Sequence, residues 1–156
     1  MKYFYEYESA LIGKIYIAET QGFITNLVFR TIEGTEKSKT PVISRAIKQL
    51  DEYFIGKRKE FDLPVKLTGT EFQQKAWVAL LDIPYGQTRT YKQQAESIGN
   101  VKACRAVGAA NGKNPISIIF PCHRVIGANK KLTGYGGGIR IKKTLLQLEG
   151  ALSELK

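Results

Sequence analysis

The sequence predicts an α/β protein of the α+β type, in which a strand-rich first part precedes a mainly helical second part. Residues 1–30 are rich in β-branched and aromatic side chains, whereas later segments carry apolar residues at helical spacing. Two Thr-x-x-Gln segments in the second part can each cap a helix. A length of 156 residues suits one domain or two very small ones, and 43% hydrophobic residues suffice for a packed core.

The first part is expected to hold a β-hairpin, a loop and one helix. Residues 11–18 and 23–29 have extended, β-branched and aromatic character, with a polar turn at 19–22 between them. Residues 31–41 are polar and charged and predict a loop. Apolar residues then follow helical spacing over 42–55, so a helix is expected there.

A charged segment at residues 57–67 is the candidate linker. The charge balance changes at the same place, because residues 1–64 hold 10 Lys and Arg against 9 Asp and Glu, whereas residues 65–156 hold 14 against 5. We therefore expect two domains, over residues 1–66 and 67–156. A basic second domain indicates a polyanionic partner, although a merely solubilising surface would have the same composition.

The second part is predicted to open with two capped helices. Thr70 and Gln73 fit a capping box, in which each side chain bonds the backbone N–H of the other residue. Thr90 and Gln93 fit a second capping box that begins a short helix, and Gly99 suits the left-handed position that ends it.

A third helix is expected from residue 101 to about residue 110, so that two helices flank a tight glycine turn as in a helix-turn-helix. Ordinary helical bundles contain the same arrangement. Small residues let a helix approach a groove and basic ones bind phosphate. The small and basic residues in and beside this helix are Lys102, Ala103, Arg105, Ala106, Gly108, Ala109, Ala110 and Lys113. Cys104 is expected to be a small core residue.

No segment predicts a membrane span or an export signal. The most apolar stretch, residues 116–120, is far shorter than the ~20 residues that cross a bilayer as a helix. Residues 1–6 lack the apolar character of a signal peptide, so a cytoplasmic protein is expected. An anionic membrane surface is a weaker rival to nucleic acid as the partner, because no strongly amphipathic basic helix is evident.

The chain has two cysteines, Cys104 and Cys122, and one histidine, His123. These three residues cannot form a Cys₄, Cys₃His or Cys₂His₂ zinc site, so no such metal is expected. Any imidazole chemistry must therefore use His123, which is next to a cysteine.

Cys122 is the candidate nucleophile. A cysteine attacks as the thiolate, and a nearby imidazole or cation raises the thiolate fraction; His123 and Arg124 follow it directly. Residues 116–120 predict a strand, in which neighbours point to opposite faces. His123 would then reach the sulfur only through a bent backbone or a bridging water. A buried structural cysteine in a chance context is the alternative.

Glu149 is the second unusual residue. It ends the last predicted helix, over residues 139–149, where a carboxylate opposes the helix dipole. A buried carboxylate that orients the His123 imidazole would explain it, as in other triads of nucleophile, base and orienting group. A solvated surface glutamate is the alternative.

At this centre the chain resembles the O6-alkylguanine-DNA alkyltransferases, the methylated-DNA–protein-cysteine methyltransferases. The resemblance is strong over residues 67–150 and weak over residues 1–66. The motifs that carry it, in the family's order, are Phe72-Gln73 with Trp77, Ile-Pro-Tyr-Gly-Gln-Thr at 83–88, Tyr91, Arg-Ala-Val-Gly at 105–108, Asn114-Pro115, Pro-Cys-His-Arg-Val at 121–125, Gly134-Tyr135 and residues 145–150.

The resemblance implies an RNase H-like α/β domain followed by a winged helix-turn-helix that binds the minor groove of DNA. It implies direct, irreversible transfer of the alkyl group from O6-alkylguanine, and from O4-alkylthymine, in double-stranded DNA to a cysteine. The protein would be consumed in a single turnover, act as a monomer and need no cofactor or metal.

The site residues of the family carry over position by position. Cys122 resembles the alkyl acceptor, His123 the base that activates it through a water, and Glu149 the carboxylate that orients the histidine. Asn114 resembles the residue that braces the active-site turn. Tyr91 resembles the tyrosine that contacts the flipped guanine and the phosphate beside it.

Arg105 resembles the arginine finger that enters the duplex in place of the rotated base. The same DNA-binding surface is expected to include Lys102, Ala106 and Lys113. Tyr135 lies on the loop that covers the guanine pocket, and Val125 on the pocket floor. Gly136 stands where many members have serine, which leaves the rigidity of the loop and the substrate range open.

Other classes of protein explain fewer of these residues. An unrelated Cys–His hydrolase leaves the basic second domain unexplained, and a plain helix-turn-helix regulator leaves Cys122, His123 and Glu149 without a role. A binding-only relative would lack the acceptor cysteine. The chain also lacks the zinc ligands of some members, and its length leads us to expect no additional cysteine-rich domain.

Overall fold

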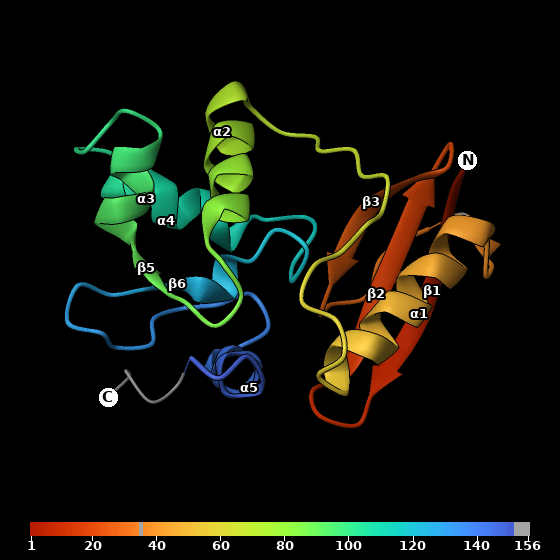
Figure 1. The fold of residues 1–156 in the computed structure, drawn as a ribbon. Helices are drawn as coiled ribbons and strands as arrows, with labels where there is room; N and C mark the ends of the chain where they lie inside the picture. The colour runs from red at the N-terminus through yellow and green to blue at the C-terminus, as the bar shows by residue number, and fades with distance from the viewer. Residues whose placement is uncertain (35, 152–156) are drawn as a thin grey trace.

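A mixed β-sheet forms the first part of the computed structural model, which describes residues 1–34 and 36–151 (Figure 1). Strands β1 (Lys2–Ser9), β2 (Gly13–Thr20) and β3 (Phe23–Val28) are antiparallel neighbours. The two-residue strand β4 (Glu36–Lys37) pairs in parallel with β1, which gives the order β3-β2-β1-β4. The predicted hairpin is therefore present, a further strand precedes it, and the predicted loop contains β4.

Helix α1 (Pro41–Phe54) covers one face of this sheet, as Figure 1 shows. Thr40 caps its first turn by accepting a hydrogen bond from the Ile43 backbone, and Pro41 suits the first helical position because no partner is needed there. Its apolar face is buried, and Gly56 follows its end with a φ of 78°. The predicted helix is thus confirmed to within a residue at each end.

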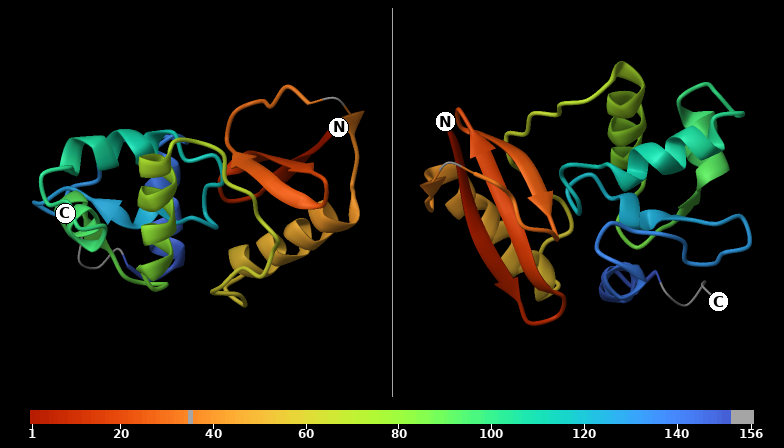
Figure 2. Two further views of the ribbon diagram at one scale, coloured as in Figure 1. Left: turned by 90° about the horizontal axis from the view of Figure 1, so that it is seen from above. Right: turned by 180° about the vertical axis from the view of Figure 1, so that it is seen from behind.

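The outer edge of β3 joins the sheet to the second part of the chain. The Leu27 N–H donates to the Pro115 carbonyl and the Leu27 carbonyl accepts from the Ser117 N–H, each at 2.8 Å. Ile24 makes an equivalent pair of bonds with Pro64 and Lys66 at 2.8 and 3.0 Å. Part of the predicted linker is therefore bonded to the sheet edge, and the chain then passes to the second part, as Figure 2 shows.

Four α-helices build the second part as far as residue 151, where the described residues end. They are α2 (Glu71–Ala79), continued by the 3-10 helix η1 (Leu80–Asp82), then α3 (Tyr91–Ser97), α4 (Cys104–Gly112) and α5 (Ile139–Leu148). Both predicted capping boxes are present with reciprocal bonds of 2.8 to 3.1 Å. Gly99 follows α3 with a φ of 78°, as its predicted role requires. Helices α3 and α4 form the helix-turn-helix.

Two predictions for the segments around these helices are wrong in detail. Residues 101–103 form a turn, in which the Ala103 N–H donates to the Asn100 carbonyl, so α4 begins at Cys104 and not at residue 101. Cys104 is only half-buried, with its thiol 3.6 Å from the Val101 carbonyl, and it is not a core residue. Ala103 is the N-cap residue of α4, and its side chain makes no capping hydrogen bond.

The apolar run 116–120 is a tight turn and not the predicted strand. Ile118 has a φ of 71°, and the Ile119 N–H donates to the Ser117 carbonyl at 2.8 Å. The run is apolar because it lies buried between the two parts of the molecule. A short apolar run indicates burial and does not distinguish a strand from other buried backbone.

A second, two-stranded sheet lies beside the helix-turn-helix. Strand β5 (Arg89–Thr90) leads into α3 and pairs in parallel with β6 (Val125–Ile126). Its place completes the winged arrangement that the resemblance implies. Among the helices in the described part of the chain, none is long and apolar enough to cross a membrane.

Candidate active site

Cys122 begins a short 3-10 helix, η2 (Cys122–Arg124), directly after the buried turn. Its side chain is 6% exposed. The Asn114 amide donates to Cys122 Sγ at 3.3 Å and to the Phe120 carbonyl at 2.7 Å, while its oxygen accepts from the Ile116 N–H at 3.0 Å. Asn114 therefore ties the turn together and bonds the sulfur with the same side chain.

Burial raises the pKa of the Cys122 thiol above its ordinary value, and the Asn114 hydrogen bond and the Lys142 charge oppose that rise. Lys142 was not singled out from the sequence as a site residue. It is fully buried on α5, and its Nζ donates to the Thr133 carbonyl at 3.3 Å. Burial lowers its pKa to about 8. Lys142 lies three positions before the apolar Leu145, so the two share one face of the helix. That spacing could have indicated from the sequence that Lys142 is buried.

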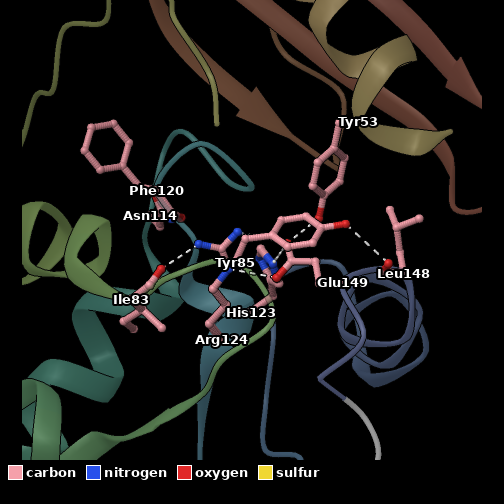
Figure 3. Close-up of polar contacts among 9 residues, drawn as sticks. All are labelled: Tyr53, Ile83, Tyr85, Asn114, Phe120, His123, Arg124, Leu148 and Glu149. Carbon is pink, nitrogen blue, oxygen red and sulfur yellow. Dashed lines mark hydrogen bonds and ion pairs between the residues drawn. The ribbon is translucent and has the colours of Figure 1, made fainter. Parts of the chain in front are cut away.

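The structure brings His123 and Glu149 together. His123 is fully buried, and its Nε2 lies 2.8 Å from Glu149 Oε2 at the end of α5 (Figure 3). Burial lowers the pKa of His123 and the Glu149 carboxylate opposes that change, so the imidazole is neutral near pH 7. Its Nδ1 is buried and has no hydrogen-bond partner among the described residues, which leaves this nitrogen able to accept a proton.

Glu149 has two further partners that the sequence did not reveal. Arg124 bonds both carboxylate oxygens, with Nε 2.8 Å from Oε1 and Nη2 3.0 Å from Oε2, and its Nη1 donates to the Ile83 carbonyl. Tyr53, on α1, donates its hydroxyl to Oε2 at 2.6 Å. Burial alone would raise the pKa of Glu149, but His123 and Arg124 hold it well below its ordinary range.

These partners explain a carboxylate at the C-terminal end of a helix. The unfavourable helix dipole is offset by two hydrogen bonds from the Arg124 guanidinium and by one each from Tyr53 and His123. Arg124 could have been proposed from its place beside His123. No local pattern points to Tyr53, because the contact joins residues 96 positions apart.

The loop after β6 covers the thiol. Tyr135 packs its ring against Phe29 with centroids 5.6 Å apart, and its hydroxyl is buried without a hydrogen-bond partner among the described residues. Gly136 helps to line a cavity of about 20 Å³ beside Cys122. That space suits about one water molecule and is far too small for a purine. Val125 is fully buried in the same core.

The predicted DNA-binding residues on and beside α4 are exposed. Arg105 and Ala106 are exposed on α4, whose opposite face is buried. Lys102 and Lys113 are exposed just before and just after the helix. Tyr91 lies at the start of α3 and shares a hydrogen bond of 2.5 Å with the Thr133 hydroxyl.

No group of three or more His, Cys, Asp and Glu side chains in the described residues could hold a metal ion. The site therefore combines a buried thiol, a neutral imidazole and a fixed carboxylate with exposed basic residues on and beside α4. This combination suits a nucleophilic cysteine that acts on a nucleic-acid substrate.

Comparison with known proteins agrees with this combination. Residues 2–67 match the family model for the 6-O-methylguanine DNA methyltransferase ribonuclease-like domain, and residues 71–151 match the model for the DNA binding domain of the same family. The chain thus belongs to the 6-O-methylguanine DNA methyltransferase family.

Individual relatives cover almost the whole chain. The methylated-DNA–protein-cysteine methyltransferase of Mycobacterium tuberculosis is 52% identical over 143 residues, which cover 88% of this chain and 87% of the relative. A crystal structure of the O6-methylguanine methyltransferase from M. tuberculosis matches with a TM-score of 0.88 at 48% identity, covering 97% and 94% of the two chains. A structure of the M. tuberculosis protein in complex with DNA matches with a TM-score of 0.86 at 49% identity, covering 96% and 93%.

Proposed function

We propose that this protein repairs double-stranded DNA by moving the alkyl group of O6-alkylguanine, and of O4-alkylthymine, onto Cys122. The observation that carries the proposal is the buried cluster in which Asn114 bonds the sulfur and Glu149 fixes the neutral His123. The names of the similar proteins, methylated-DNA–protein-cysteine methyltransferases, support the same reaction.

The chemistry is an in-line displacement at the alkyl carbon. His123 takes the thiol proton through a water at Nδ1, and Glu149 stabilises the imidazolium that forms. The thiolate forms the carbon–sulfur bond as the bond from carbon to O6 breaks, and the electron pair passes to guanine. A donor must stabilise that charge, which suits the Tyr91 hydroxyl and backbone N–H groups near O6.

The damaged base has to leave the duplex to reach the sulfur. A stacked base is inaccessible, and weakened pairing at an alkylated base lowers the cost of rotating it out. We assign Arg105 to the gap in the duplex, with phosphate or groove contacts from Lys102, Ala106 and Lys113. Val125, Tyr135 and Gly136 form the guanine pocket. Since the cavity at Cys122 is about 20 Å³, the loop carrying Tyr135 and Gly136 must move when the base enters.

The product is a thioether, which these residues have no means to hydrolyse, so each molecule acts once. Residues 1–66 are proposed as the supporting domain and residues 67–156 as the DNA-binding and alkyl-transfer domain; residues 152–156 lie outside the described part. We further propose a cytoplasmic location. We propose a monomer that works without a cofactor.

The test is to incubate the protein with a duplex oligonucleotide that carries one O6-methylguanine and to weigh the intact protein. We expect a gain of one methyl group, mapped to Cys122 and absent in Cys122→Ser. Cys104→Ser is the matched control and should gain the methyl group as the unaltered protein does. A folded sample that gains no mass would overturn the proposal.

A further inference from the structure

Tyr53 links the first part of the chain to the carboxylate that binds His123. It lies in the last turn of α1, and its side chain is fully buried. Its hydroxyl donates to Glu149 Oε2 at 2.6 Å, and Figure 3 shows the ring pointing from α1 onto that carboxylate. The first part therefore contributes a polar group to the site in addition to its packing.

The bonded oxygen is the one that His123 uses. Glu149 Oε2 accepts from the Tyr53 hydroxyl, from His123 Nε2 at 2.8 Å and from Arg124 Nη2 at 3.0 Å, whereas Oε1 accepts from Arg124 Nε. Three donors converge on one oxygen, so its orientation is fixed and its charge is partly neutralised. Loss of any one donor changes the orientation and the effective negative charge of the carboxylate beside the His123 imidazole.

The hydroxyl and the ring of Tyr53 have separable roles. Burial, followed by the Glu149 charge, holds the pKa of Tyr53 well above its ordinary value, so the hydroxyl stays a donor while His123 titrates. The ring is held independently by aromatic contacts with Phe54, Phe61 and Tyr85, at centroid distances of 5.3, 5.4 and 6.4 Å. Removal of the oxygen alone leaves these contacts in place.

We propose that Tyr53 is a positioning residue of the alkyl-transfer reaction, whose hydroxyl orients the Glu149 carboxylate and limits the negative charge felt by His123. This inference rests on the proposed function. It gives the first domain a part in the chemistry, through a residue at the end of α1.

Several elements bring charged or titratable groups to the His123–Glu149 pair. They are Tyr53 on α1, Cys122 and Arg124 on η2, Lys142 on α5, and Tyr85 and Tyr135 on the flanking loops. Without the Tyr53 hydroxyl the carboxylate is less well solvated, and a less solvated carboxylate favours the imidazolium over the neutral imidazole. General-base catalysis needs the neutral form, so the defect grows as the pH falls.

The experiment compares Tyr53→Phe with the unaltered protein, both without an affinity tag. Single-turnover alkylation by an O6-methylguanine duplex is followed by mass from about pH 5.5 to about pH 8.5, the range around the ordinary histidine pKa. The chain has one histidine, so its imidazole proton signal reports His123 alone by NMR. We expect alkylation to slow about tenfold, as when a group that orients a functional imidazole is lost, and the His123 titration midpoint to move upward.

Tyr7→Phe is the matched control. The Tyr7 hydroxyl also donates to a carboxylate at 2.6 Å, that of Asp51, on the same helix α1 but away from the site. This variant should keep the alkylation rate and the His123 titration of the unaltered protein. Equal slowing in Tyr7→Phe would show general loosening of the first domain and would overturn the proposal.

Two further outcomes are decisive. A Tyr53→Phe protein that melts at a lower temperature but keeps its rate and its His123 titration would make Tyr53 purely structural. If Tyr53→Phe does not fold, 3-fluorotyrosine at position 53, a stronger donor of nearly the same size, should lower the His123 midpoint; no shift would refute the inference. Failure of the unaltered protein to gain a methyl group would instead reject the proposed function, because the NMR titration does not depend on it.

Discussion

Asn114 is the residue whose side chain bonds the Cys122 sulfur. Burial disfavours the thiolate, and the Asn114 amide is a neutral donor that bonds the sulfur directly. The same amide closes the turn through Phe120. A single side chain thus fixes the position of the sulfur and adjusts its acidity.

Replacement of Asn114 by aspartate tests this double role. In Asn114→Asp an ionised oxygen replaces the donor beside Sγ, so the thiolate meets a like charge and the bond to Phe120 is lost. We expect alkylation to slow by about 100-fold or more, within the range typical of lost acid–base assistance. Single-turnover rates, corrected for the folded fraction, measure the effect.

Gln94→Glu provides the control for Asn114→Asp. Gln94 is another buried amide, which donates to the Ala76 carbonyl and to Asn111 at 3.0 and 2.9 Å, on α3. Its replacement should lower stability by about 1–3 kcal/mol, as for an unsatisfied buried group, without slowing the folded protein. An Asn114→Asp protein as fast as the unaltered one would show that the amide does not assist the thiol.

Helix α4 has one face that packs in the protein and one exposed face that is proposed to contact DNA. Val107, Ala110 and Asn111 are buried against the rest of the domain, whereas Arg105 and Ala106 face outward. The Ala110 carbonyl accepts from the Trp77 indole at 2.7 Å, which anchors the helix to α2. The outward face is thus held on a rigid base and can carry the contacts to DNA.

Arg105→Ala tests the part of α4 in base rotation. If Arg105 fills the gap in the duplex, its loss raises the cost of extruding the base. We expect repair of a duplex to slow by about tenfold, a loss of about 1.4 kcal/mol in the barrier, with transfer from a free O6-alkylguanine base nearly unchanged. Parallel mass measurements on the two substrates check this.

Lys102→Ala is the companion variant to Arg105→Ala. A phosphate contact adds affinity without sequence information, so this variant should bind duplex more weakly and reduce the slope of log K against log salt by about 1. It should not favour one substrate over the other once binding is saturated. Equal slowing on both substrates by Arg105→Ala would remove the proposed role of Arg105.

At the scale of the whole molecule, the buried site makes stability depend on pH. The native state holds His123 with a lowered pKa, so between that value and about 6.5 only the unfolded state binds a proton. Stability should therefore fall as the pH decreases below about 6.5. The depressed pKa of Glu149 stabilises the native state above about pH 4.3, and this contribution is lost at lower pH.

Urea unfolding at pH 7.5 and at pH 5.5 tests the histidine contribution, because carboxylates are ionised in the unfolded chain at both values. The free energy of unfolding should be lower at pH 5.5. His123→Gln should remove most of this pH dependence whatever its absolute stability, since the chain has no other histidine. An unchanged dependence in His123→Gln would show that other groups cause it.

The edge of β3 and the end of α1 connect the first part of the chain to the residues around Cys122 and Glu149. The sheet edge bonds the turn before Cys122 at Leu27, and α1 bonds Glu149 through Tyr53. Both ends of the buried cluster from Cys122 to Glu149 are therefore bonded to the first part of the chain. Loss of either contact should change the position or the acidity of the Cys122 thiol.

The sequence by itself determined the elements whose signals are local. The capping boxes at Thr70 and Thr90, the helix predicted over 42–55 and the glycine after α3 each follow from residues within a few positions of one another. The resemblance likewise located Cys122 and its neighbours, because those motifs are continuous. The pairing of Glu149 with His123 was predicted from an unfavourable helix dipole.

Only the tertiary structure decided which distant groups meet. The run 116–120 is a turn because Asn114 and the edge of β3 bond its backbone, and these bonds outweigh the β propensity of its residues. Lys142 is buried and Tyr53 reaches Glu149 because packing brings together segments up to 96 residues apart. The local sequence pattern does not predict such contacts, because their energy depends on desolvation and geometry that exist only in the folded chain.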